Sequence, residues 1–382
     1  MNQLSVKTSL QAMHANQSGE PASILFVDKV FLKPRRAIPL RGVEVFNLNL
    51  IRDLRRLRYP VDLILSGSWT STVRHQLGED SPQLIIVPET GLDFLNALVA
   101  GCSRRLGRYD VLLIGNVGKS LIPMIRILQI RRRFAHVVLI AHREANRKFA
   151  QLSAALPGHV IAVNSLIAKP FIQFGHPHVW VDYGINNANE FYPGEREVDE
   201  LVHFVVMGML DNAWKGADTA IAAFRLLPES VRDRCRLHLA SYTHPPDLGD
   251  DRIVAYSWMP LGDVPGFLRG MDVMLVPSRD EGVMRETFSQ VAVQGMLTGL
   301  PLLVSDLMVL REKVDAGGGS VFRNEKELAS KMAEWAEQPG ERRRLGEEAR
   351  HTALDRYVWD TARFAARYLE EHVHGKGNED DG

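Results

Sequence analysis

The chain has few cysteines and no long apolar run, and both absences limit what it can be. Its 382 residues include only Cys102 and Cys235, and neither has a CxxC or CxxH neighbour. Such isolated thiols provide no metal or redox motif, so we interpret both as structural. No run of about 18 apolar residues occurs, so no transmembrane helix is expected. The polar first twenty residues lack the apolar core of a signal peptide, and we therefore expect a cytoplasmic protein.

Two nucleotide-binding signatures are also missing. The segment GNVGKS at 115–120 is close to a P-loop, but that loop needs a further glycine at position 113, which is Leu113. No GxGxxG follows the first apolar segment, so a classical dinucleotide site lacks support. We interpret Gly115 and Gly118 as turn residues at a strand end, facing a cleft between domains. The chain also lacks an Asp-x-Asp signature and any Cys/His metal spacing.

Net charge is absent as well, but the balance is uneven along the chain. Residues 1–190 contain 23 Lys and Arg against 13 Asp and Glu, whereas residues 191–382 contain 23 against 33. The first half is therefore positive, with clusters at 32–36, 52–58, 104–108 and 131–134. These clusters favour contact with an anionic membrane surface, although a solvated helix face explains each one equally well. We expect no nucleic-acid partner.

The length suits two domains, and the apolar pattern predicts an α/β fold in each. Strands are expected at 23–30, 61–67, 83–89, 110–116 and 136–142, with helices at 42–57 and 120–133. The helix at 120–133 is apolar nearly all round, so we expect most of it in the core, with its final arginines in solvent. The pattern begins again at 201–208 and continues to 301–306, and helices follow at 326–337 and 361–373.

These segments predict two Rossmann-like domains facing one another across a cleft. The expected ranges are a flexible N-terminus at 1–20, a first domain at 21–185 and a second domain at 186–358. A C-terminal helix at 359–375 is expected to cross back to the first domain, before a disordered tail at 376–382.

The second domain carries the stronger chemical signals. After the strand at 201–208, a loop with Lys215 and Gly216 enters a helix, and N–H groups at that helix start beside a lysine suit a diphosphate. The later stretch RETFSQVAVQGMLTGLP, at 285–301, predicts a helix from Phe288 to Thr298 that is closed by Gly299. Glu286 and Gln294 are eight residues apart, up to roughly 12 Å at helical rise.

Together these segments resemble GT-B glycosyltransferases, in particular the retaining family 4 (glycosyl transferases group 1). The resemblance covers about 23–370. It is carried by the helix-start loop at 41–44, the hinge at 183–186, the loop with Gly208 and Lys215, and Glu286 to Gln294 followed by GMLTGLP at 295–301. The family's second glutamate is Gln294 here, and its usual diphosphate-binding arginine is Met209.

The resemblance implies a site for a nucleoside-diphosphate sugar, without a metal ion or other cofactor. Glu286 and His142 would orient the sugar, and Lys215 would stabilise the departing diphosphate. The implied donor-binding residues are Gly42, Gly208, Met209, Lys215, Thr287, Phe288, Ser289, Gln290 and Gln294.

The two departures have different expected effects. An amide at Gln294 can still hold a ribose diol, but less tightly than a carboxylate, by about 1 to 2 kcal/mol. Met209 removes one cation, which Arg143, Arg279 or Arg285 could replace.

We therefore expect a retaining glycosyltransferase that moves a sugar to a hydroxyl of a glycan or lipid-linked acceptor, peripherally bound at the inner face of a membrane. A catalytically silent subunit of the same fold and a sugar-nucleotide epimerase remain alternatives. A nucleoside triphosphatase is the third and least supported.

Overall fold

The computed structural model describes residues 20–35, 40–90, 92–194, 201–282 and 286–370. The chain divides into two compact units, Met1–Asp182 with Asp360–Gly382, and Tyr183–Trp359. The sequence predicts boundaries at 185/186 and 358/359. Residues 1–19 and 371–382, to which most of the expected flexible N-terminus and the whole expected tail belong, lie outside the described part of the chain.

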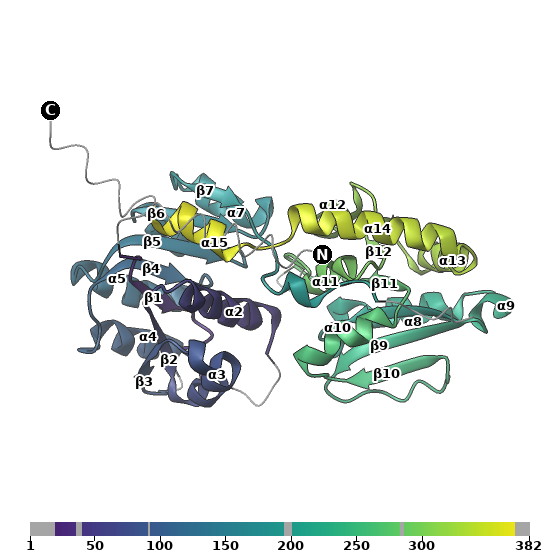
Figure 1. Ribbon diagram of the computed structural model, residues 1–382, viewed down its shortest axis with the longest axis horizontal. Helices are drawn as coiled ribbons and strands as arrows, with labels where there is room; N and C mark the ends of the chain where they lie inside the picture. The colour runs from purple at the N-terminus through teal and green to yellow at the C-terminus, as the bar shows by residue number, and fades with distance from the viewer. Residues whose placement is uncertain (1–19, 36–39, 91, 195–200, 283–285, 371–382) are drawn as a thin grey trace. The chain divides into compact units, whose positions relative to one another are not determined.

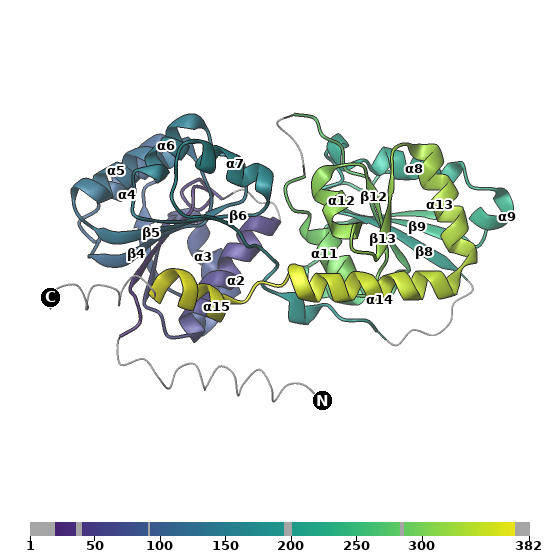
Figure 2. The ribbon, with the colours of Figure 1, turned by 90° about the horizontal axis from the view of Figure 1, so that it is seen from above.

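The first unit is built on a seven-stranded parallel sheet with the order β3-β2-β1-β4-β5-β6-β7 (Figure 1). Its strands are β1 (Ile24–Val27), β2 (Val61–Ser66), β3 (Gln83–Val87), β4 (Tyr109–Ile114), β5 (Phe134–Ala141), β6 (Gly158–Ala162) and β7 (Val179–Val181). The central strand β1 is buried along its whole length, and its neighbour β4 is buried except at Asp110, because helices cover both faces. On one face lie α2 (Gly42–Arg56), α3 (Thr70–Leu77) and α15 (Thr361–Ala365), and on the other α4 (Asp93–Cys102), α5 (Ile122–Ile130), α6 (Arg147–Ala154) and α7 (Ser165–Gln173) (Figure 2).

The second unit has a six-stranded parallel sheet with the order β10-β9-β8-β11-β12-β13. Its strands are β8 (Val202–Met207), β9 (Cys235–Tyr242), β10 (Ile253–Ser257), β11 (Val273–Val276), β12 (Leu302–Ser305) and β13 (Gly319–Phe322). Helices α8 (Ala217–Arg225) and α13 (Glu325–Glu337) pack together over one main core cluster. Helix α11 (Gln290–Leu297) packs against α14 (Pro339–Arg356) and lies close to the sheet, since a Cβ on Gly295 would be 2.9 Å from Met274 Cε. The α/β fold expected from the sequence is confirmed, and each unit is Rossmann-like.

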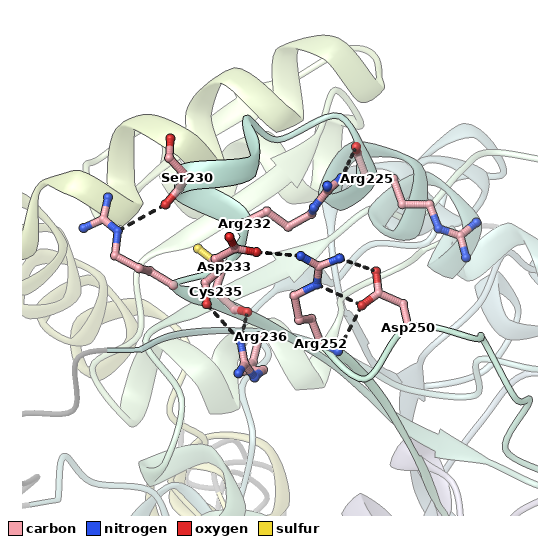
Figure 3. A network of polar contacts seen from close by, with 9 residues as sticks. Arg225, Ser230, Arg232, Asp233, Cys235, Arg236, Asp250 and Arg252 are labelled. Carbon is pink, nitrogen blue, oxygen red and sulfur yellow. Dashed lines mark hydrogen bonds and ion pairs between the residues drawn. The ribbon is translucent and has the colours of Figure 1, made fainter.

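Each sheet has one point where the strand order reverses. In the first unit it lies between β1 and β4, and in the second between β8 and β11. Open α/β sheets bind ligands outside the carboxyl ends of the strands at such a point. At the amino ends of the strands of the second sheet, a network of arginine side chains connects the loops (Figure 3). Arg252 bonds Asp233 at 2.7 Å and Asp250 at 3.0 Å, which ties the loops before β9 and β10 together.

The expectation for the helix at 120–133 is wrong in part. Helix α5 buries Met124, Ile125 and Leu128, but Ile130 is 81% exposed at its end. The final arginines do not simply extend into solvent either, because Arg131 Nη1 donates to the carbonyls of Gly101 (2.8 Å) and Ser103 (3.1 Å). No described helix is both long and apolar enough to cross a membrane.

Candidate functional site

The loop between β8 and α8 brings Lys215 to the carboxyl edge of the second sheet. Gly208 follows β8 with φ 144°, and Gly216 ends the loop with φ 73° at the N-cap of α8. A Cβ at Gly216 would lie 2.0 Å from the carbonyl oxygen of Pro277, directly after β11. Only glycine therefore allows this loop to approach the end of β11, and the approach places Lys215 at the point where the strand order reverses.

Glu286 meets Lys215 at that point. The Lys215 Nζ lies 2.8 Å from Glu286 Oε2, and the two side chains are only 13% and 9% exposed. The Ser278 hydroxyl donates to the same oxygen at 3.1 Å. No described group donates a hydrogen bond to Oε1, which can still accept one from a ligand. Two residues chosen separately from the sequence thus lie together, with one carboxylate oxygen fixed and one available.

The start of α11 lies beside this pair and has an unusual backbone. Ser289 is the N-cap of α11 with φ 61° and ψ 78°, a left-handed conformation that non-glycine residues seldom adopt. Its hydroxyl does not cap the helix, and its buried Oγ has no hydrogen-bond partner among the described residues. A buried hydroxyl without a partner costs free energy unless a ligand satisfies it. The same turn presents the first N–H groups of α11, which suit an anion or a sugar oxygen.

Two other residues of the expected set are engaged inside the unit. The Phe288 ring packs edge-on against Tyr183, with 4.7 Å between ring centroids. Gln290 Nε2 donates to the Tyr183 hydroxyl at 3.3 Å. These side chains hold the turn in place, whereas the Ser289 hydroxyl and the backbone N–H groups of the turn can contact a ligand. Thr287 is half-buried in the same turn.

Gln294 lies one turn further along α11. It is half-buried, and its side-chain amide forms no hydrogen bond to any described residue. The backbone carbonyl of Gln294 accepts hydrogen bonds from Thr298 N at 3.0 Å and from Thr298 Oγ1 at 2.9 Å. The helix ends just before Gly299, as expected. The amide is therefore available for a ligand.

Met209 is half-buried after Gly208, and the cations suggested as its replacements have different situations. Arg279 Nη2 bonds Asp218 Oδ1 at 2.5 Å and Thr219 Oγ1 at 2.7 Å, so it is already used to hold the start of α8. Arg285 lies outside the described residues. Arg143 belongs to the first unit and forms no ion pair with any described residue.

Sequence reasoning missed Lys313, a buried lysine on α12 (Met308–Val314). It is 2% exposed, and its Nζ lies 4.1 Å from the ring centroids of both Phe288 and Tyr357. Burial lowers the pKa of Lys313 to about 7, while the Glu286 carboxylate opposes that shift. The segment LREKV reads as an ordinary charged helix face, so no local signal distinguishes this lysine from an exposed one.

The expected residues of the first unit lie at the carboxyl edge of its own sheet. His142 directly follows β5 and is buried, with its ring 5.3 Å from that of Phe46. Burial lowers the pKa of His142 to about 3, so the imidazole is neutral at pH 7. Gly42 begins α2, where Glu44 Oε2 accepts from Arg41 N at 2.8 Å.

Residues 202–338 match the family described as glycosyl transferases group 1. No curated protein matches the sequence.

Solved structures match over most of the chain. Anabaena Alr3699/HepE in complex with UDP and glucose is 16% identical, covers 90% of this chain and 97% of its own, and has a TM-score of 0.66. A glycosyltransferase from Rickettsia africae is 13% identical, covers 94% and 100%, and has a TM-score of 0.73. Sucrose-phosphate synthase from Thermosynechococcus elongatus is 14% identical, covers 91% and 97%, and has a TM-score of 0.67. At such identities the likeness is one of fold.

Proposed function

We propose that this chain, whose residues 202–338 match the glycosyl transferases group 1 family, is a glycosyltransferase of GT-B fold that uses a nucleoside-diphosphate sugar as donor. In this proposal the sugar moves, with retention of anomeric configuration, to a hydroxyl of a glycan or lipid-linked acceptor. The HepE structures are complexes with UDP and glucose, with UDP, or with UDP-glucose, which supports a donor of this class.

The observation that carries the proposal is the cluster of Lys215, Glu286 and Ser278 beside the start of α11. A lysine ammonium has three donors, so Lys215 can keep Glu286 fixed while it contacts a phosphate oxygen. Glu286 Oε1 then accepts from a sugar hydroxyl, and the Ser289 hydroxyl and the N–H groups of α11 bind the sugar or the phosphate. We also propose that His142 and Gly42 take part in donor binding.

Such a site catalyses transfer through electrostatics and positioning. Negative charge develops on the diphosphate as its bond to the sugar breaks, and Lys215 with the helix N–H groups stabilises that charge. The acceptor hydroxyl attacks from the face that the diphosphate leaves. We propose no role for a bound metal ion or another cofactor.

A silent subunit is the second candidate, and two residues favour it. Met209 supplies no cation after β8, and Gln294 supplies no carboxylate on α11. A silent subunit of this fold would show no donor binding.

The test is a thermal-shift screen against UDP-, GDP-, ADP- and dTDP-sugars, with and without EDTA, followed by calorimetry and a turnover assay. We expect one donor to bind, and EDTA to leave its binding and turnover unchanged. Glu286→Ala should keep the fold but lose more than about 90% of turnover, a barrier increase above about 1.4 kcal/mol.

Three results would contradict parts of this scheme. Retained turnover in Glu286→Ala would remove that residue from its role. Binding of no donor would favour the silent subunit. Donor conversion without any acceptor would indicate an epimerase.

A lipid-linked acceptor forms part of the proposal because of one surface of the first unit. Arg104, Arg105, Arg108 and Arg132 are exposed around the exposed Ile130, and we call these five residues the basic edge. The bonds from Arg131 to the Gly101 and Ser103 carbonyls hold the ends of α4 and α5 together there. An exposed isoleucine among arginines suits an anionic membrane surface, where each basic residue contributes about 1 kcal/mol. We propose that the protein binds the inner face of a membrane through this edge.

A further inference from the structure

The carboxyl edge of the first sheet holds two cations, Lys29 and Arg143. Lys29 lies two residues beyond β1, and Arg143 lies two residues beyond β5. Strand β4 runs between them, with Ile114 aligned to Val27 on one side and to Leu139 on the other. Neither cation forms a hydrogen bond or an ion pair with any described residue. Lys29 therefore lies at the point of strand reversal and Arg143 one strand beyond it, and no described residue pairs with either charge.

The segment GNVGKS, which is not a P-loop, explains how Lys29 is held there. A Cβ on Gly118 would lie 2.7 Å from Lys29 Cδ, so this glycine leaves room for the lysine stem. Gly115 plays the same part for Asn47, since a Cβ there would lie 2.7 Å from Asn47 Nδ2. The side chain of Lys29 thus packs against the backbone of the loop after β4 at Gly118.

Two nearby carboxylates, those of Asp28 and Asp93, bind other groups than Lys29 and Arg143. Asp28 is buried and accepts from Asn47 Nδ2 at 2.6 Å and from Val30 N at 2.7 Å. Asp93 forms an ion pair with Lys33 at 2.6 Å. Burial and then the charge of Arg143 lower the pKa of Lys29 to about 8, although Asp28 and Asp93 oppose the change. The repulsion between the two positive charges destabilises this ligand-binding edge. Binding of an anion would remove that repulsion.

We propose that Lys29 and Arg143 bind a phosphate or carboxylate group at the ends of β1, β4 and β5, and that this group belongs to the acceptor. The assignment to an acceptor rests on the proposed function, whereas the anion site itself does not. The second unit supplies its own groups for the donor diphosphate, namely Lys215 and the N–H groups of α8 and α11. A phosphate-bearing acceptor fits this site, whereas the basic edge lies at the amino ends of β4 and β5, at the other end of the same sheet.

The test measures how fast the Lys29 amine reacts with an acetylating reagent near pH 8, by mass spectrometry, with the exposed Lys119 as internal reference. Inorganic phosphate is compared with chloride at equal ionic strength. An anion that raises the pKa of Lys29 from about 8 to about 9 lowers its labelling about fivefold, because the free-amine fraction falls. Lys119 should label equally in both salts.

Variants identify the partner of Lys29. Arg143→Met removes the like charge, so Lys29 should label more slowly without phosphate and lose the protection that phosphate gives. Arg74→Met, on the exposed side of α3, should behave as the wild type. Equal protection in Arg143→Met and the wild type would remove Arg143 from the site.

Repeating the experiment with saturating UDP, GDP, ADP or dTDP separates the two sources of anion. Protection by inorganic phosphate that persists beside a bound nucleotide supports the acceptor site. Protection by a nucleotide alone, with none added by phosphate, would assign the cations to the donor diphosphate and overturn the proposal. No protection by either would show that no anion site exists. Calorimetry on the nucleotide tests the proposed function separately, since a chain that binds phosphate but no nucleotide keeps this site and loses that function.

Discussion

Gln294 on α11 has a side-chain amide without a hydrogen bond to any described residue. If it holds the donor ribose, Gln294→Glu should tighten donor binding about five- to thirtyfold, because a carboxylate accepts from both hydroxyls of a diol. Turnover at saturation should change little, since the ribose is remote from the breaking bond. Calorimetry with the identified donor measures the first effect and steady-state kinetics the second. Gln129→Glu on α5 controls for the added charge, and weaker binding in Gln294→Glu would mean that the site is adapted to an amide.

Lys313 makes stability depend on pH in a direction that can be worked out. Its native pKa is lowered from 10.5 to about 7, so between these values the unfolded chain binds more protons than the native one. The free energy of unfolding should therefore rise with pH in this range, by up to about 1.4 kcal/mol per unit from this group.

Lys313→Met should remove that slope and stabilise the protein most at pH 7 and below. Urea unfolding at pH 7, 8 and 9 measures it, with the exposed Lys326→Met as the matched control. A slope that persists in Lys313→Met would mean that the native lysine keeps its proton.

The sequence shows which individual residues are candidates for the site, but it does not show which of them contact one another. Lys215 and Glu286 could be chosen from their motifs, but nothing in either motif shows that the two form an ion pair. Lys313 could not be found, because its burial depends on Phe288 and Tyr357, which are distant in the sequence.

At the scale of elements, the loop before α8 depends on Gly216. Gly216→Ala would place a methyl group 2.0 Å from the Pro277 carbonyl and force a left-handed backbone on alanine. We expect a loss of stability of at least about 1 to 3 kcal/mol, seen as a lower midpoint in urea unfolding, together with weaker donor binding. Gly262→Ala, with no atom within 4 Å of the added methyl, should change neither. Unchanged stability in Gly216→Ala would show that the loop can move away from β11.

Element prediction succeeded where apolar periodicity was strong and failed where it was weak. The strands β1, β2, β4 and β8 are short apolar runs, and each was predicted. The longest described helix, α14, was missed because its sequence PGERRRLGEEARHTALDR has few apolar residues. Its helical character comes from charged residues with high helix propensity and from pairs such as Arg344 with Glu341 and Glu348. The segment 147–181 was also missed, although it forms α6, β6, α7 and β7.

At the scale of the whole molecule, the basic edge should determine membrane association. The protein should sediment with anionic vesicles at low salt and be released as salt rises, because screening shortens the reach of the arginines. Arg104→Glu with Arg105→Glu should abolish sedimentation, and Ile130→Glu should weaken it. Arg343→Glu, an exposed arginine of the second unit, should have no effect. Equal sedimentation of all variants would mean that another surface binds the vesicles.

The division of the chain has a consequence for its synthesis. The second unit is an insertion within the first, and its two ends are joined by hydrogen bonds from Ile185 N to Tyr357 O (2.8 Å) and from Trp359 N to Ile185 O (3.0 Å). The first unit needs α15, whose Thr361 bonds Asp53 on α2 at 3.2 Å. During translation the inserted unit can therefore finish folding first, while the unit that began earlier must wait until α15 has left the ribosome.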